Sequence, residues 1–265
     1  MFRWLKVHRR KKLLAEPFPE AWRNTIERNV RLYGTLTADE QASVRSYVQV
    51  FAAEKVWEPC GGLVMTDEIR VTIAAQVGIL VLGLSPIEYF DHVLSVLVYP
   101  DTYVAEQAQT HRGGGVIEQG DSARLGEAWY RGPVILAWGD VLREARGDRP
   151  GHNVTLHEFA HQLDMLNGRD TDGTPPLETA DQDRRWLEVL ERRYRELVEA
   201  CEQGRSTTLD CYGATNPAEF FAVATELFFE RPEVMQRHLE DLYGLFREFY
   251  RQDPAGRGHV RRAER

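Results

Sequence analysis

Two histidines and a glutamate within five consecutive residues form the segment of this sequence best suited to chemistry. His157 and His161 are four positions apart, and residues at that spacing share one face of an α-helix, with about 5–6 Å between their Cβ atoms. Two imidazoles at this separation can bind one metal ion through their ring nitrogens. Glu158 directly follows the first histidine and is well placed to polarise a water molecule on that ion. The spacing therefore predicts a metal site that carries its own base.

This arrangement is the H-E-x-x-H signature of zinc hydrolases, in which the glutamate acts as general base. The same pattern also occurs by chance on exposed helices, where both histidines are simply solvated. Apolar residues surround the pattern on most sides, which predicts a buried helix: Val154, Leu156, Phe159, Ala160, Leu163, Met165 and Leu166. Buried polar groups need partners, because an unpaired one costs roughly 1–3 kcal/mol. A zinc ion would satisfy all three side chains.

Catalytic zinc sites usually have three protein ligands and a water molecule, and three carboxylates compete for the third position. Asp164 shares the helix face but lies about one turn beyond His161, so we expect it to orient a histidine or close the helix end. Glu219 and Glu226 are seven residues apart, on one face of a later helix. Glu219 also fits the third position of a helix cap, and Glu226 could instead orient a histidine or pair with an arginine. Spacing alone leaves both open.

Length and composition exclude several classes of protein. The chain has 265 residues, which is enough for one large or two smaller domains. Its residues are 43% hydrophobic and 28% charged, a composition that excludes long disordered stretches. A net charge of −8 argues against a general nucleic-acid-binding protein. The longest apolar run, residues 71–84, is shorter than the roughly 18–20 residues that span a bilayer. We therefore expect no membrane span and a cytoplasmic protein.

The three cysteines, Cys60, Cys201 and Cys211, match neither a disulfide framework nor a C-x-x-C metal site, and their odd number suits a reducing compartment. Residues 1–16 carry six Lys or Arg and no acid before Glu16, which predicts a flexible basic arm. We expect a single domain over residues 17–252 and a flexible basic tail over residues 253–265. The arm resembles the start of a signal peptide, but no apolar segment follows it.

The pattern along the chain predicts an α+β fold. Helices are expected over residues 19–33, 37–55 and 66–84, and a capping box at Thr37 and Glu40 opens the second of them. Strands are expected over residues 92–99, 116–119 and 132–138, and Pro133 should place the last one at an edge of a small mixed sheet. The metal helix follows, from about residue 152 to 168. Further helices are expected over residues 180–201, from residue 216, and over residues 232–250.

Longer motifs resemble a known family. H-E-F-A-H-Q-L-D-M-L-N-G at 157–168, D-C-Y-G at 210–213 and N-P-A-E-F-F-A at 216–222 resemble the Mlc titration factor A family, as do G-E-A-W at 126–129 and G-P-V-I-L-A-W at 132–138. That family is similar to the catalytic domain of anthrax lethal factor, in the gluzincin group of zinc peptidases. The resemblance covers most of the chain and implies a zincin-like core with additional N-terminal helices.

The resemblance implies a role for five residues. His157, His161 and Glu219 match the ligands of one zinc ion, Glu158 matches the base, and Tyr212 matches a tyrosine that donates to a developing oxyanion. Spacing alone would make Tyr212 a packing aromatic in a turn, although a phenol near zinc can stabilise a tetrahedral intermediate. The Glu-x-x-x-Asp pattern of thermolysin-like gluzincins is absent, so the group that orients the zinc histidine must come from elsewhere.

Three functions compete at this point. The first is a zinc metallopeptidase with aminopeptidase-type activity on short peptides, as the resemblance implies. The second is a binding protein that captures the transcriptional repressor Mlc and so affects the regulation of sugar uptake; this role could coexist with the first. The third is a zinc-stabilised scaffold without turnover, against which Glu158 argues because a structural site has no use for a base.

Overall fold

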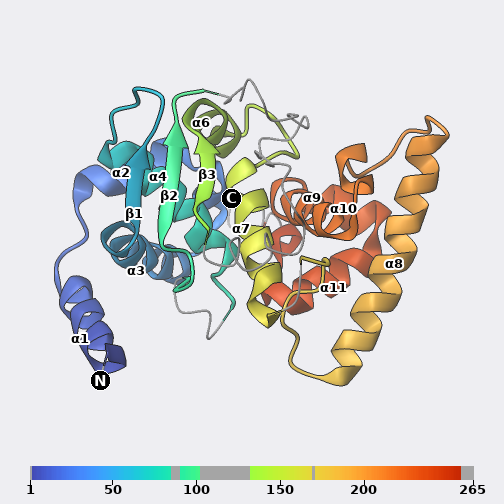
Figure 1. Cartoon of the computed structure of the whole chain (residues 1–265), viewed down its shortest axis with the longest axis horizontal. Helices are drawn as coiled ribbons and strands as arrows, with labels where there is room; N and C mark the ends of the chain where they lie inside the picture. The colour runs from blue at the N-terminus through green and yellow to red at the C-terminus, as the bar shows by residue number, and fades with distance from the viewer. Residues whose placement is uncertain (1, 85–89, 102–131, 169–170, 258–265) are drawn as a thin grey trace, which may run out of the picture.

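The computed structural model describes residues 2–84, 90–101, 132–168 and 171–257. Helix α7, Val154–Asp164, lies between a small sheet with its helices and a group of C-terminal helices (Figure 1). The α+β class is confirmed. The expected strand at 116–119 and the G-E-A-W segment at 126–129 fall outside the described residues.

The N-terminal helices follow the sequence closely. Helix α2, Glu20–Asn29, continues into the short 3-10 helix η1, Arg31–Thr35. Helix α3, Ala38–Glu54, begins with the expected capping box between Thr37 and Glu40. Helix α4, Asp67–Leu80, is capped by the Thr66 side chain and is buried along almost its whole length. Its apolar surface on all sides makes it the central core helix of this half.

Three described strands form a parallel sheet in the order β1-β2-β3, whereas we expected a mixed one. They are β1, Val56–Pro59, β2, Ser95–Tyr99, and β3, Val134–Ala137. Parallel neighbours need long crossovers, and the β1 to β2 connection contains α4. Strand β3 ends the order of the described strands, as Pro133 predicts. Strand β1 was not expected, because its four residues are too few to show a clear pattern.

The second half is helical. Helix α6, Trp138–Arg146, precedes α7, which ends in the 3-10 helix η2, Met165–Asn167. Helix α8, Ala180–Glu202, is followed by the 3-10 turn η3, Cys211–Ala214, and by α9, Pro217–Glu230. The single helix expected over residues 232–250 is two, α10, Pro232–His238, and α11, Glu240–Tyr250. The break lies at Leu239, whose backbone (φ −139°, ψ 51°) leaves the helical region.

Aromatic packing holds α7 and α9 in place from both sides. Phe159 of α7 packs edge-on against Phe51 and Phe90, with ring centroids 5.8 and 5.1 Å away. Phe221 of α9 packs against Trp186 of α8 and Phe246 of α11, at 5.8 and 5.7 Å. The metal helix and the helix that faces it therefore each belong to a rigid core.

Described residues near both ends of the chain form helical structure. Residues Phe2–Ala15 form helix α1, on which Arg10 is buried between Glu54 and Asp91. At the other end, residues 254–257 form a helical turn, and Arg257 pairs with Glu40 at 2.8 Å. The division into arm, domain and tail stays a prediction. No helix among the described residues is long and apolar enough to cross a membrane.

Candidate metal centre

One amide and two carboxylates hold the N-terminus of α7, where backbone N–H groups lack helical partners. The Asn153 side chain accepts from the N–H of Leu156 at 3.1 Å. Glu144 accepts from the N–H of Val154 at 2.6 Å, and Glu226 accepts from the N–H of Asn153. These bonds fix the first turn of the helix, and so fix the direction in which His157 points one turn later.

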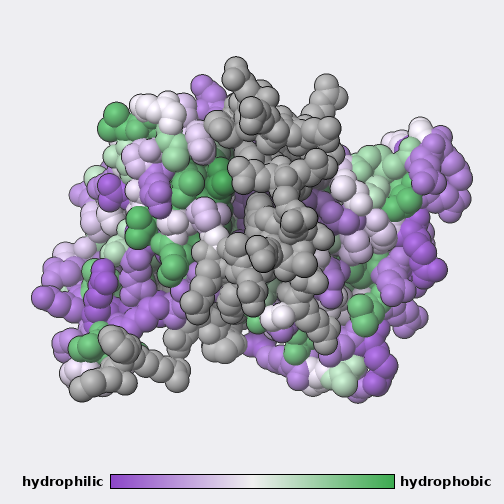
Figure 2. Space-filling model, in the orientation of Figure 1, coloured by the Kyte–Doolittle hydropathy of each residue, from purple (hydrophilic) through white to green (hydrophobic). Residues whose placement is uncertain are grey.

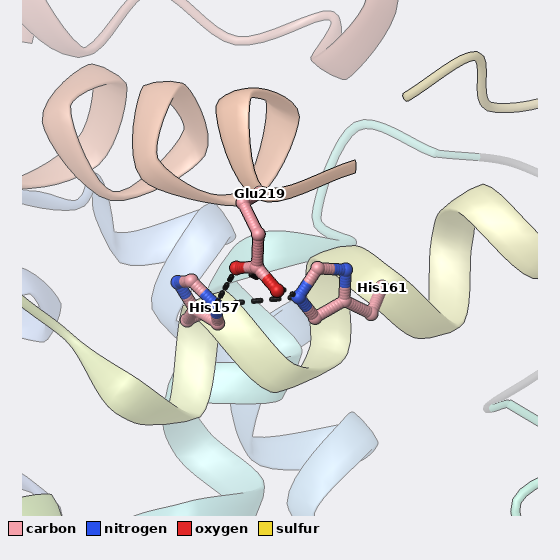
Figure 3. Close-up of side chains that lie close together, drawn as sticks. All are labelled: His157, His161 and Glu219. Atoms are coloured by element: carbon pink, nitrogen blue, oxygen red, sulfur yellow. Dashed lines mark hydrogen bonds and ion pairs between the residues drawn. The ribbon is translucent and has the colours of Figure 1, made fainter. Parts of the chain in front are cut away.

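His157, His161 and Glu219 come together between α7 and α9 (Figure 3). The His157 Nε2 atom lies 3.0 Å from Glu219 Oε2 and 3.2 Å from His161 Nε2, and the distance from His161 Nε2 to Glu219 Oε2 is 3.5 Å. Three ligand atoms around a tetrahedral zinc with bonds of about 2.1 Å would be about 3.4 Å apart. The three side chains that the family resemblance implied as ligands thus form a set of zinc-binding size.

The hydrogen bonds around these atoms also call for a cation. Glu226 Oε1 lies 2.8 Å from His157 Nδ1, and a carboxylate only accepts, so the ring proton sits on Nδ1. The lone pair on His157 Nε2 then faces the carboxylate of Glu219, which has only lone pairs to offer. Unless His157 is doubly protonated, two acceptors then lie 3.0 Å apart, and a cation between them would relieve their repulsion. Two imidazoles and one carboxylate are also a donor set that suits a divalent metal ion.

The close approach of these acceptor groups shifts the pKa values of His157 and Glu219. Burial alone would lower the pKa of His157, but Glu219 and Glu226 outweigh it and raise that pKa well above its usual value. Burial alone would raise the pKa of Glu219, but the two histidines hold it well below its usual range. Both shifts describe a negative carboxylate beside a positive imidazolium, and a divalent metal ion would supply that positive charge in its place.

Glu226 is placed to orient His157 from the outer side of its ring. Spacing left Glu219 and Glu226 as equal candidates for third ligand, and the structure separates them, since one carboxylate lies at each ring nitrogen of His157. Both project from the same face of α9, two turns apart. A carboxylate on the outer nitrogen of a metal-binding histidine fixes its tautomer and raises its basicity. Glu226 thus fills the place left by the missing Glu-x-x-x-Asp pattern.

Glu158 lies beside the two histidines and is partly exposed. Burial among the surrounding groups raises the pKa of its carboxyl, and the charges of His157 and His161 oppose that shift. A carboxylate with a raised pKa beside a metal site is suited to accept a proton near neutral pH.

Tyr212 lies on η3, with its ring centroid 6.0 Å from that of His157. Burial raises the pKa of its hydroxyl, and the negative charges of Glu219 and Glu158 raise it further, so the group stays a proton donor. The turn is held firmly: Asp210 accepts from the N–H of Tyr212 at 2.8 Å, and Thr215 donates to its carbonyl at 2.7 Å. The phenol is therefore fixed at the edge of the histidine pair.

A disulfide between Cys201 and Cys211 ties the end of α8 to the turn that carries Tyr212. Our expectation that the cysteines form no disulfide was wrong. The nine residues between them reverse the direction of the chain, so that the two Cα atoms lie 5.8 Å apart. Gly213, next in the turn, is closely packed, because a Cβ there would lie 3.3 Å from Leu197 and 3.4 Å from Val223. Helices α8 and α9 thus pack against η3 from both sides.

Asp164 does not reach the histidines through any hydrogen bond of the described residues. Its Oδ2 accepts from the N–H of Gly173 at 2.8 Å, and its Oδ1 has no partner among those residues. Gly173 (φ +79°) also accepts from the indole N–H of Trp186 at 2.9 Å. Asp164 therefore ties the loop at Gly173 to the last turn of α7, and no hydrogen bond within the described residues lets it orient a histidine.

Two further buried acids were not expected from the sequence. Glu144 pairs with Arg149 at 3.2 Å, and Glu230 binds Arg31 and, at 3.0 Å, the Asn153 amide. Burial raises the pKa of each carboxyl, and the charge of Glu226 raises both further. A spacing of four residues places Glu230 on the same face of α9 as Glu226, and this spacing could have identified Glu230 from the sequence. No sequence pattern pointed to Glu144, because helix α6 was not expected.

Comparisons with known proteins agree with this geometry. A family model described as the glucose-regulated metallo-peptidase M90 matches residues 4–251. An uncharacterized protein of Synechocystis is 38% identical over 247 residues, covering 93% of this chain and 89% of its own. Proteins named Mlc titration factor A from Yersinia pestis and Yersinia pseudotuberculosis are 32% identical over 232 residues, covering 86% of this chain and 84% of theirs. The chain, which brings His157, His161 and Glu219 together in this way, belongs to the glucose-regulated metallopeptidase family M90.

Proposed function

We propose that this protein is a zinc-dependent peptidase, with one zinc ion held by His157, His161 and Glu219. The observation that carries the proposal is the convergence of three acceptor atoms within 4.8 Å of one another, beside a glutamate and a tyrosine that could do chemistry. A structural zinc site is closed by four protein ligands, whereas three ligands leave a position for water or substrate. Membership of a metallopeptidase family supports the same conclusion.

Zinc at this site would supply Lewis acidity, which activates water near neutral pH and polarises a carbonyl. Glu158 takes the proton from the water molecule as its oxygen attacks the carbonyl carbon of the peptide. The hydroxyl of Tyr212 donates to the oxygen that becomes negative, and it can do so because its pKa is raised. Glu158 then returns its proton to the amine nitrogen as the carbon–nitrogen bond breaks. Glu226 keeps His157 in one tautomer throughout.

The experiment that tests this function uses Glu158→Gln. The amide has nearly the same shape but cannot take a proton, so zinc content should stay at one per chain while peptide hydrolysis falls by about 10²–10⁴-fold. Glu191→Gln on the exposed face of α8 is the control, and it should keep full activity. Full activity in Glu158→Gln would remove the proposed base. Loss of folding in that variant would favour the zinc-stabilised scaffold.

We further propose aminopeptidase-type cleavage of short peptides in the cytoplasm, on the resemblance to the Mlc titration factor A family. A set of fluorogenic substrates with free and with acetylated N-termini tests the specificity. Preference for the free amine supports an aminopeptidase, and equal cleavage of both forms contradicts it.

A second function, capture of the repressor Mlc, is proposed because relatives at 32% identity are named for titrating Mlc. Zinc and the catalytic groups occupy α7, η3 and α9, so the remaining helices can bind a partner without disturbing them. A pull-down of purified Mlc by the wild type and by Glu158→Gln tests this role. Equal capture by both supports a binding function separate from hydrolysis, and no capture by either contradicts it.

A further inference from the structure

Several large apolar side chains of helix α1 face solvent. Four of the eight large hydrophobic residues exposed in the described part of the chain lie on this one helix: Trp4 (70% exposed), Leu5 (53%), Val7 (44%) and Leu14 (40%). At 3.6 residues per turn, Trp4, Val7, Lys11 and Leu14 fall within an arc of about 80°. The helix thus carries a narrow apolar stripe, interrupted by one lysine, on the side away from the protein.

The side of α1 that faces the protein is polar, which explains why its apolar side chains lie on the solvent side. Arg10, 7% exposed, binds Glu54 and Asp91, each at 2.6 Å. Lys6 also reaches Asp91 at 2.6 Å, and Arg9 donates to the carbonyl of Ala53 at 3.2 Å. Helix α1 is therefore fastened to the end of α3 through charges, and its apolar stripe is left over for another surface.

The positive charge of α1 indicates which kind of partner surface its apolar stripe would contact. The helix carries six of the 33 Lys and Arg residues and none of the 41 Asp and Glu residues, in a chain with a net charge of −8. Figure 2 shows this helix at the lower left, with hydrophobic and hydrophilic atoms side by side. A basic helix with tryptophan and aliphatic residues on one face is the pattern of helices that lie flat in a membrane interface. Its 14 residues, about 21 Å long, are too few to cross a bilayer.

Other occupants fit this face less well. A second copy placed stripe to stripe would bring two strongly basic helices together, and like charges at that distance repel. A nucleic acid would neutralise the lysines but leave Trp4 and Leu14 without an apolar partner, since its backbone surface is charged. An anionic bilayer offers negative headgroups and an apolar layer beneath them, which match both features.

We propose that α1 docks this protein on anionic phospholipid membranes, with Trp4, Val7 and Leu14 in the boundary between headgroups and acyl chains and with Lys11 and Lys12 on the phosphates. The helix meets the membrane in the plane of the interface. The remaining charge of the chain is negative, so the contact is confined to this end of the molecule.

The test is co-sedimentation of the full-length protein with vesicles of phosphatidylglycerol and phosphatidylcholine in equal parts, compared with pure phosphatidylcholine. Binding should require the anionic lipid and should weaken when salt is raised from about 0.1 to 1 M. Trp4→Ser should reduce partitioning by about tenfold or more, since burial of such a side chain is lost. Lys11→Glu combined with Lys12→Glu should reduce it by at least about fivefold for each charge removed.

Val64→Ser is the matched control, because Val64 is 76% exposed but lies outside α1. Its partitioning should equal that of the wild type. Circular dichroism of each variant should show an unchanged fold, because the substituted side chains face outward. The proposal is overturned if the protein binds neutral vesicles equally well, or if Val64→Ser and Trp4→Ser lose equal amounts of binding. It is also overturned if the protein does not bind anionic vesicles, as when α1 instead mediates dimerisation or RNA binding.

Discussion

Glu226 offers the sharpest test of how the metal site is built. Its two carboxylate oxygens accept from two buried donors, the Nδ1–H of His157 and the backbone N–H of Asn153. Glu226→Ala removes both acceptors at once. Each donor left unpaired costs about 1–3 kcal/mol, and a histidine without its outer carboxylate binds metal about 10–100-fold more weakly.

The assay is competition for zinc against a chromophoric chelator at neutral pH, with unfolding by urea measured separately on the metal-free protein. We expect the zinc Kd of Glu226→Ala to rise about 10–100-fold, which is about 1.4–2.7 kcal/mol of binding. The zinc Kd of Glu226→Gln should lie between those of the wild type and Glu226→Ala, because its amide can accept from one of the two donors but not from both.

Glu230→Ala is the control for this comparison. Glu230 is buried on the same helix and also binds Asn153, but it makes no contact with a histidine in the described structure. Its loss should therefore destabilise the fold while leaving zinc affinity unchanged. A Kd for Glu226→Ala within twofold of the wild type, or an equal loss in Glu230→Ala, would refute the orienting role.

Three further predictions follow from buried or constrained residues. Burial raises the pKa of Asp164 from 3.8 to about 6, so the fold disfavours its ionised form and stability falls as pH rises between those values. Between pH 4 and pH 7 the metal-free wild type should lose about 2 kcal/mol relative to Asp164→Asn in urea unfolding, and equal slopes would contradict this. Without reductant, the denatured protein should show one reactive thiol, Cys60, because Cys201 and Cys211 are joined; three thiols would show that the disulfide is absent. Gly173→Ala would place a Cβ 2.4 Å from the carbonyl oxygen of Pro217, so we expect a loss of about 1–3 kcal/mol of stability and weaker zinc binding through Glu219; an unchanged urea midpoint would contradict the close contact.

The parts of the site that could be predicted from sequence are those in which the pattern itself carries the geometry. His157 and His161 share a helix face at any four-residue spacing, and the Thr37 capping box is local, so both appear as expected. Glu219 could be chosen over Glu226 only through a family resemblance. The choice depends on how α9 is rotated against α7, which no local pattern encodes.

Other features depend on contacts between distant segments. The disulfide needs the end of α8 to meet η3, and the helical state of α1 is accompanied by the burial of Arg10 between Glu54 and Asp91. The parallel sheet follows from the crossovers rather than from the strands themselves, because four- or five-residue strands carry little directional information. In each case the sequence defines the parts, and tertiary packing decides how they pair.

The central claim is that a zinc ion is held by two histidines of α7 and one glutamate of α9. Elemental analysis of the purified wild type, of Glu219→Ala and of Glu158→Gln tests it most directly. We predict one zinc per chain in the wild type and in Glu158→Gln, and none in Glu219→Ala. Full zinc in Glu219→Ala, or no zinc in the wild type, would contradict the account.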